Sequence, residues 1–148
     1  MLICSIKFGH ISESIKIDKG NKYFSRAVDF GYSKHPDETF TIWDKEKVLG
    51  DLVWIIRKVR PDVIITRFNT AAGTTHGHHT ASAILAGEAF EIAGDDTKYR
   101  EQLTYVDPWK PTSLYWNTYS WRQSEFQEDN DDLIGYDIGK FNNLLGMS

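Results

Sequence analysis

The chain has 148 residues, of which 41% are hydrophobic and 26% are charged, and these are the values of one ordinary globular domain. The formal net charge of −4 argues against a nucleic-acid partner, and the single cysteine, Cys4, excludes an intramolecular disulfide and a thiolate metal cluster. No apolar run approaches the ~20 residues that cross a bilayer, so we expect no membrane span and a cytoplasmic location by default, with export possible for a longer parent protein.

The first part of the chain gives weak structural signals. Met1–Ile6 could form a short first strand, and Ile15–Asp18 alternates apolar and polar residues and could form another. Lys19–Lys22 has the composition of a turn, and the aromatic-rich stretch Tyr23–Tyr32 fits either a strand or a loop.

The segment Lys34–Glu38 allows two interpretations. Its residue types fit a hydrolytic metal site, with His35 and Glu38 as ligands and Asp37 as the base. Such a motif should follow a buried apolar strand, which the preceding residues do not provide. We therefore expect a loop in which proline fixes the backbone and the acidic residues precede a helix, and we keep the metal site as the alternative.

The first strong helix signal begins near Asp44 and ends before Pro61. Apolar residues recur at intervals of three and four along it, which is typical of a helix with one face in the core. Proline cannot continue the helix, and the β-branched run Asp62–Thr66 that follows reads as a strand buried on both faces of a parallel sheet.

Three histidines follow this strand. A polar loop, Arg67–Thr75, leads to His76, His78 and His79, which open an alanine-rich helix predicted to run to about Ala93. Sites of α/β proteins lie where strands end and helices begin, and imidazoles can bind zinc or stabilise an oxyanion. A polar, solvated helix start is the other interpretation of these histidines.

The last third of the chain is less informative. Ser113–Thr118 reads as a strand after a proline-rich connector, and Glu125–Asp132 as a solvated acidic loop. Ile134–Leu145 reads as a short strand or turn. An aromatic cluster in this region could pack in the core or stack on sugar rings, and core packing is the more common role; its members are Trp109, Tyr115, Trp116, Tyr119 and Trp121.

The strand and the histidine box together resemble the LmbE-like, or GlcNAc-phosphatidylinositol de-N-acetylase-like, zinc hydrolases. These enzymes carry an Arg-Pro-Asp strand like Arg60–Thr66 and then a His-Pro-Asp-His box, which His76–His79 matches. The likeness extends from about Lys16 to Trp121, including Tyr23–Gly31, and returns at Tyr136–Gly146. The resemblance implies an α/β fold, a partial Rossmann-like three-layer sandwich with a mainly parallel sheet.

The resemblance also implies roles for individual residues. It makes His79 a zinc ligand and His76 the group that polarises the scissile carbonyl or its oxyanion. His78 stands where the family usually has aspartate, which puts the tuning of His76 in question. From their place just after the strand, we expect Arg67 and Asn69 to contact a substrate, which would be a small N-acetylated sugar or a similar amide.

One family feature is missing from the sequence. The first metal motif of the family, Ala-His-Pro-Asp-Asp-Glu, supplies two zinc ligands and the base, and Met1–Ile15 contains nothing like it. We therefore expect residues 1–148 to form a single truncated domain, an internal piece of a larger enzyme that hydrolyses amides poorly by itself and tends to self-associate because a neighbour of the Val63–Thr66 strand is lacking.

Two other classes of function compete with this one. A non-catalytic carbohydrate-binding or partner-binding remnant of the fold is the main alternative, because the first metal motif is missing and His78 stands in place of aspartate. A dinucleotide-binding domain is disfavoured, because no Gly-x-Gly-x-x-Gly sequence follows the strand.

Overall fold

A computed structural model describes residues 2–4, 21–71, 73, 75–118 and 133–135. The chain divides into two compact units, Met1–Thr118 and Tyr119–Ser148, and all the described helices and strands belong to the first. The predictions for residues 15–18 and 125–132, and most of that for 134–145, lie outside the described residues. Whether residues 1–148 form one truncated domain stays a prediction.

Three parallel strands form the sheet of the first unit. β1 (Leu2–Cys4), β2 (Val63–Thr66) and β3 (Ser113–Trp116) pair in the order β1-β2-β3, and Ile64 of β2 lies opposite Leu2 on one side and Leu114 on the other. This arrangement confirms the α/β class with a parallel sheet. The expectation that β2 lacks a neighbour is wrong, because residues near the N-terminus supply a strand beside it.

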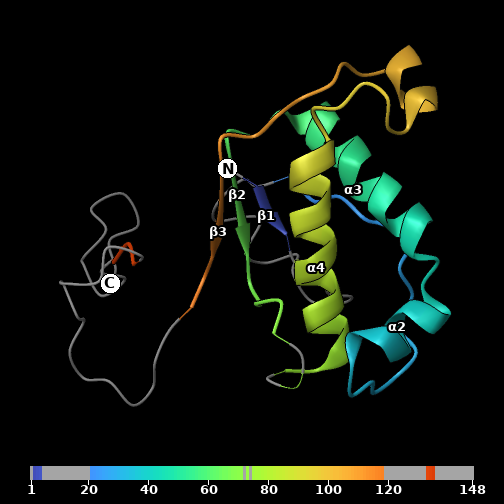
Figure 1. The fold of residues 1–148 in the computed structure, drawn as a ribbon, viewed down its shortest axis with the longest axis vertical. Helices are drawn as coiled ribbons and strands as arrows, with labels where there is room; N and C mark the ends of the chain where they lie inside the picture. The colour runs from blue at the N-terminus through green and yellow to red at the C-terminus, as the bar shows by residue number, and fades with distance from the viewer. Residues whose placement is uncertain (1, 5–20, 72, 74, 119–132, 136–148) are drawn as a thin grey trace. The chain divides into compact units, whose positions relative to one another are not determined.

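The order of the strands explains where the helices lie. Successive parallel strands that sit side by side need right-handed crossovers, and these put the connecting helices on one side of the sheet. Accordingly, α3 (Lys45–Val59) and α4 (Gly77–Ile92) lie together on the same side of the strands (Figure 1). None of the described helices combines the length and the apolar character that crossing a membrane requires.

α3 follows closely from its sequence. The Asp44 carboxylate accepts a hydrogen bond from the backbone N–H of Lys47 at 3.2 Å, which caps the first turn. The helix ends at Arg60, whose φ of 54° is left-handed, immediately before Pro61. The predicted boundaries of this helix, and those of α4, are confirmed to within about a residue.

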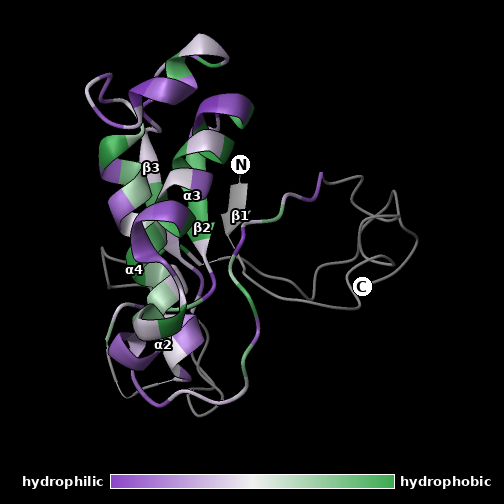
Figure 2. Cartoon of the chain, turned by 90° about the vertical axis from the view of Figure 1, so that its right-hand side faces the viewer, coloured by the Kyte–Doolittle hydropathy of each residue, from purple (hydrophilic) through white to green (hydrophobic). Residues whose placement is uncertain are grey.

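The core lies between the helices and β2. The apolar stripe of α3 meets small residues of α4, so the two helices approach closely, and β2 is drawn mainly in the hydrophobic colour in Figure 2. The buried members are Ala27, Trp43, Val48, Leu49, Leu52, Val53, Ile56, Ile64, Ala81, Leu85, Ala89 and Ala93. Burying a side chain of the size of leucine contributes ~1.5–3 kcal/mol, so this cluster is the main source of stability.

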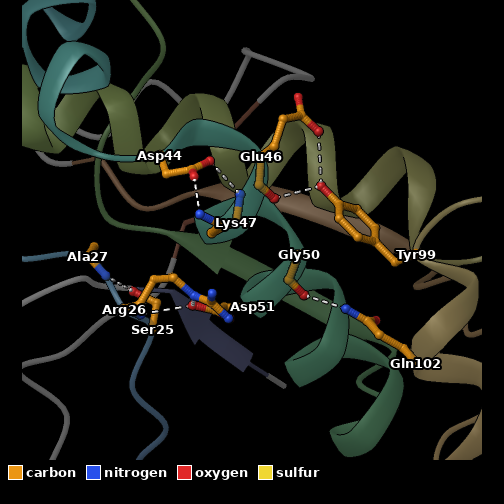
Figure 3. Close-up of polar contacts among 10 residues, drawn as sticks. All are labelled: Ser25, Arg26, Ala27, Asp44, Glu46, Lys47, Gly50, Asp51, Tyr99 and Gln102. Carbon is orange, nitrogen blue, oxygen red and sulfur yellow. Dashed lines mark hydrogen bonds and ion pairs between the residues drawn. The ribbon is translucent and has the colours of Figure 1, made fainter.

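Polar contacts fasten the outer face of α3 to distant segments (Figure 3). The Arg26 guanidinium forms a two-pronged ion pair with Asp51, with the shortest N–O distance at 2.7 Å. The Tyr99 hydroxyl donates to the carbonyl oxygen of Glu46 at 2.9 Å, and burial raises the pKa of Tyr99 to about 12. These contacts tie residues far apart in the sequence to one helix.

Arg57 is the one charged side chain buried in the described core. Only 1% of it is exposed, and its guanidinium donates to the carbonyl oxygens of Ala93, Asp95, Lys98 and Tyr99 and to the side-chain oxygen of Gln102. From its place in the last turn of α3, the sequence suggests that the positive charge of Arg57 offsets the negative end of the dipole of its own helix. Instead it binds the end of α4 and the turns that precede the short helix η1 (Arg100–Thr104).

Candidate functional site

The histidines lie where the loop after β2 turns into α4. His76 is the N-cap of α4, and His78 and His79 fall in its first turn. β2 ends at Thr66, so the carboxyl end of the central strand and the start of α4 face the same end of the unit, with α2 (Pro36–Ile42) beside them at the bottom of Figure 1. This is the position at which α/β proteins place their binding sites.

The backbone donors at the start of α4 are already used within the chain. The N–H of Gly77 donates to the carbonyl oxygen of Ser33 at 2.8 Å, and the N–H of His78 donates to Nδ1 of His76 at 3.3 Å. The N–H groups of His79 and Thr80 donate to the carbonyl oxygen of His76. The usual anion-binding property of a helix N-terminus is thereby reduced, and side chains remain as donors for a ligand.

A segment from before α2 is docked against this helix start. A Cβ atom on Gly77 would lie 2.5 Å from the carbonyl oxygen of His35 and 2.5 Å from Oγ of Ser33. Only glycine permits this approach. The close contact brings the hydroxyl of Ser33 next to the histidines, although the two segments are more than forty residues apart in the sequence.

His78 turns inward from the helix start. Its ring packs against Phe30 and Trp43, with centroids 4.3 and 5.2 Å away. Its Nδ1 lies 3.0 Å from Oγ of Ser33 and 2.9 Å from Nδ1 of His76. Burial lowers the pKa of His78, and the neighbouring His76 lowers it further. His78 is therefore held as a neutral ring between aromatic side chains.

His76 and His79 are near each other at the surface of the site. Their ring centroids are 5.5 Å apart and both side chains are half-buried. The rings of Tyr32 and His76 meet edge to face, with centroids 4.7 Å apart. The Tyr32 residue is 77% exposed. The His79 ring stacks on Phe68 at 3.7 Å. The pair is thus bordered by two aromatic side chains.

The predicted substrate residues lie on the loop after β2. Arg67 donates to the side-chain oxygen of Asn117 at 2.6 Å, and the side-chain oxygen of Asn69 accepts from the backbone N–H of Ala71 at 3.1 Å. Arg67 thereby connects the loop after β2 to the residue that follows β3, and Asn69 holds the backbone of its own loop. Their contact with a substrate stays a prediction.

The described members of the predicted aromatic cluster differ in burial. Trp109 packs against the core and its Nε1 donates to the carbonyl oxygen of Pro61 at 2.8 Å, as the core interpretation predicts. Tyr115 and Trp116 of β3 are 44% and 48% exposed, so the core interpretation is wrong for these two. Tyr119 and Trp121 lie outside the described residues.

α2 begins at Pro36, so the expectation of a loop holds for Lys34 and His35 and is wrong for Pro36–Glu38. Pro36 is the first residue of α2, where its missing N–H is no loss, and Asp37 and Glu38 lie in the first turn, where acidic residues are favourable. The carboxylate of Glu38 accepts from the backbone N–H of Lys34 at 2.8 Å. His35 is exposed, and its side chain makes no capping hydrogen bond.

The described residues do not fit a zinc ion by themselves. A hydrolytic zinc site has three protein ligands and a water. Among residues 2–4, 21–71, 73, 75–118 and 133–135, no group of three His, Cys, Asp or Glu side chains is placed to hold a metal ion. Nδ1 of His76 is occupied by His78, which leaves its Nε2 for a ligand.

A hollow of about 640 Å³ lies elsewhere on the unit. It is bordered by α3, the C-terminal half of α4 and residues 97–99, including Glu46, Glu88 and Tyr99. None of the predicted site residues lines it, so the candidate site depends on the histidine geometry and not on the hollow.

Comparison with known proteins gives two relatives. The chain is 32% identical over 96 residues to 1D-myo-inositol 2-acetamido-2-deoxy-alpha-D-glucopyranoside deacetylase of Streptomyces avermitilis, a match that covers 65% of this chain and 31% of the relative. It is 35% identical over 82 residues to mycothiol S-conjugate amidase of Streptomyces coelicolor, covering 55% of this chain and 27% of the relative. The chain is thus similar to a deacetylase that is named for an acetamido sugar and to an amidase. No family model and no solved structure matches it.

The matches confirm the resemblance that the strand and the histidine box indicated. The chain spans about a third of the length of these relatives. Both relatives are named for the hydrolysis of an amide, one on an acetamido sugar and one on a mycothiol conjugate.

Proposed function

We propose that the chain carries the histidine half of an amide-hydrolase site that acts on an N-acetylated sugar or a similar small amide. The observation that carries the proposal is the placement of His76 at the N-cap of α4 and of His79 in its first turn, beside the carboxyl end of β2, with ring centroids 5.5 Å apart. The relatives named for deacetylase and amidase activity support the reaction class.

His76 is the proposed donor to the carbonyl oxygen. Amide hydrolysis passes through a tetrahedral intermediate that carries negative charge on this oxygen, and a preorganised donor lowers the barrier to reach it. The backbone N–H groups of the first turn are engaged with Ser33 and His76, so they do not serve as the oxyanion donors. Nε2 of His76, whose Nδ1 is engaged by His78, is the donor that we propose.

Zinc enters the proposal through the resemblance alone. His79 would supply one ligand, and the others would have to come from outside the described residues, since these contain no complete ligand group. A general base is worth ~10²–10⁴-fold in rate, and neither Asp37 nor Glu38 stands in a ligand group with His79. We therefore expect this chain alone to bind zinc weakly and to turn over amides poorly.

A non-catalytic binding module is the second candidate. It is favoured by the lack of a three-ligand group in the described part of the chain, and by the exposed aromatic rings of Tyr32 and Trp116, which could stack on a sugar. Such a module would bind a glycan without needing metal.

Three measurements on the same protein separate these functions. Release of glucosamine from N-acetylglucosamine derivatives is followed with zinc-loaded chain, and zinc affinity is measured by competition with a chelator. Glycan binding is measured without metal. We expect little turnover, with weak zinc binding that is lowered further by His79→Ala, and turnover that rises when a segment bearing the missing metal motif is supplied.

Other outcomes contradict the proposal in different ways. Strong turnover that is abolished by both His79→Ala and Asp37→Ala would make Lys34–Glu38 the missing motif. Tight glycan binding by the metal-free chain, unaffected by His79→Ala, would favour the binding module.

A further inference from the structure

We propose that His78 is a positioning residue that holds the His76 ring in the tautomer with its proton on Nε2. The inference concerns the pair His76 and His78, whose Nδ1 atoms are 2.9 Å apart. It rests on the proposed function in one respect only, which is that the Nε2–H of His76 is the group offered to the substrate oxygen.

The backbone of α4 fixes the proton on the first ring. The N–H of His78 points at Nδ1 of His76 from 3.3 Å, in the capping geometry that a side-chain acceptor provides. A neutral imidazole has one N–H and one lone pair, so Nδ1 must carry the lone pair to accept this bond. The proton of neutral His76 is therefore on Nε2.

The second ring must then donate. With a lone pair on Nδ1 of His76, the 2.9 Å contact is a hydrogen bond only if Nδ1 of His78 carries a proton. Oγ of Ser33 lies 3.0 Å from the same nitrogen and 2.8 Å from Oγ1 of Thr39, which is fully buried. When the Ser33 hydroxyl donates its proton to Thr39, the lone pairs of Ser33 Oγ are free to accept the proton on Nδ1 of His78.

The far side of the His78 ring gives independent support. Its Nε2 is buried and has no hydrogen-bond partner in the described part of the structure. A proton there would be a buried donor with no acceptor, which is the rarer and less favourable kind of unsatisfied group. The environment therefore puts the proton of His78 on Nδ1, in agreement with the two contacts above.

The residue type at position 78 decides the direction of this bond. A carboxylate can only accept, so an aspartate here would draw a proton onto Nδ1 of His76. A histidine held by Ser33 donates instead. The neutral tautomer of His76 in this chain therefore carries its proton on Nε2, where an acidic neighbour would favour the opposite tautomer.

The test is ¹⁵N NMR of the whole, metal-free chain with labelled histidine, at a pH where both rings are neutral. We expect a pyridine-type Nδ1 and a pyrrole-type Nε2 for His76, and the reverse for His78. A pyrrole-type Nδ1 on His76, or the tautomer mixture of free imidazole on either ring, would overturn the proposal.

Two nearly isosteric variants strengthen the test. In His78→Asn the amide nitrogen can replace Nδ1 as a donor, and in His78→Asp the carboxylate can only accept. We expect His76 to keep its tautomer in the first and to gain a proton on Nδ1 in the second, with circular dichroism showing both folded. If His76 has the same tautomer in both variants, His78 does not position it. If only one variant folds, the wild-type spectrum still decides the question.

Failure of the proposed function is recognised separately. The tautomers are measured without metal or substrate, so the spectrum supports or overturns the positioning role of His78 whatever the turnover. Should the spectrum be as expected while the chain supplied with the missing motif keeps full turnover after His76→Ala, the oxyanion role is wrong and the positioning role stands.

Discussion

The ring of His79 lies flat against the ring of Phe68, with centroids 3.7 Å apart and planes within 2° of parallel. A stacked pair contributes ~0.5–1.5 kcal/mol and fixes the orientation of the imidazole. We predict that Phe68→Leu lowers the free energy of unfolding by about this amount and weakens zinc binding, while Phe68→Tyr leaves both unchanged. Urea unfolding and a zinc competition titration measure the two effects; equal zinc affinity in all three proteins would contradict a role for the stack.

Substitution of two glycines of α4 by alanine should change the free energy of unfolding in opposite directions. A Cβ on Gly77 would lie 2.5 Å from the backbone oxygen of His35, whereas nothing lies within 4 Å of a Cβ on Gly87. We predict that Gly77→Ala destabilises by ~1–3 kcal/mol through overpacking. Gly87→Ala should stabilise by up to ~1 kcal/mol through helix propensity. Urea unfolding of both variants decides this, and a neutral Gly77→Ala would contradict the docking of the Ser33–His35 segment.

Arg57 should contribute far more to the free energy of unfolding than Arg26, which forms the two-pronged ion pair with Asp51. Arg57→Met removes the guanidinium that donates to four backbone carbonyl oxygens, of which those of Ala93, Asp95 and Tyr99 keep a backbone N–H donor. Each buried group left unsatisfied costs ~1–3 kcal/mol. Arg26→Met removes an exposed ion pair with Asp51, and we predict a much smaller loss. Thermal and urea unfolding compare them; similar losses would show that the Arg57 cluster adds little.

The raised pKa of the Tyr99 hydroxyl should lower the free energy of unfolding in alkaline solution. Burial and the nearby Glu46 raise the pKa of its hydroxyl to about 12 in the folded chain, and in the unfolded chain the hydroxyl titrates near ~10. The unfolded state therefore loses its proton first, so stability that is present below the unfolded pKa is lost as the pH rises toward the folded pKa. We predict a smaller decline in Tyr99→Phe, measured by urea unfolding at pH values below and within this window. Parallel curves for the two proteins would contradict it.

Much of the fold follows from local sequence patterns. The apolar stripe of α3, the β-branched run of β2 and the histidine-led start of α4 are predicted within a few residues, because periodicity and caps act over short distances. α2 escapes prediction, since a helix of seven residues has too few turns to show a period, and its proline reads as a turn residue.

The sequence could not show the contacts that define the site. His78 stands out in the sequence only for departing from the family aspartate, because its partner Ser33 lies 45 residues away along the chain. Arg57 looks like a charge at a helix end, and its partners on the turns after α4 lie between 36 and 45 residues further on. Capping signals such as a proline followed by two acids could have revealed α2, whereas no local signal points to either of these contacts.

The hydrogen bond from Gly77 to the carbonyl oxygen of Ser33 also has a consequence for amide exchange. Amides in the first turn of a helix usually exchange quickly with solvent, because they have no partner within the helix. In this chain the Gly77 amide is protected only while the Ser33–His35 segment is docked on α4. Its exchange rate in heavy water therefore reports how often that segment lifts away, and with it how often the Ser33 hydroxyl leaves the ring of His78.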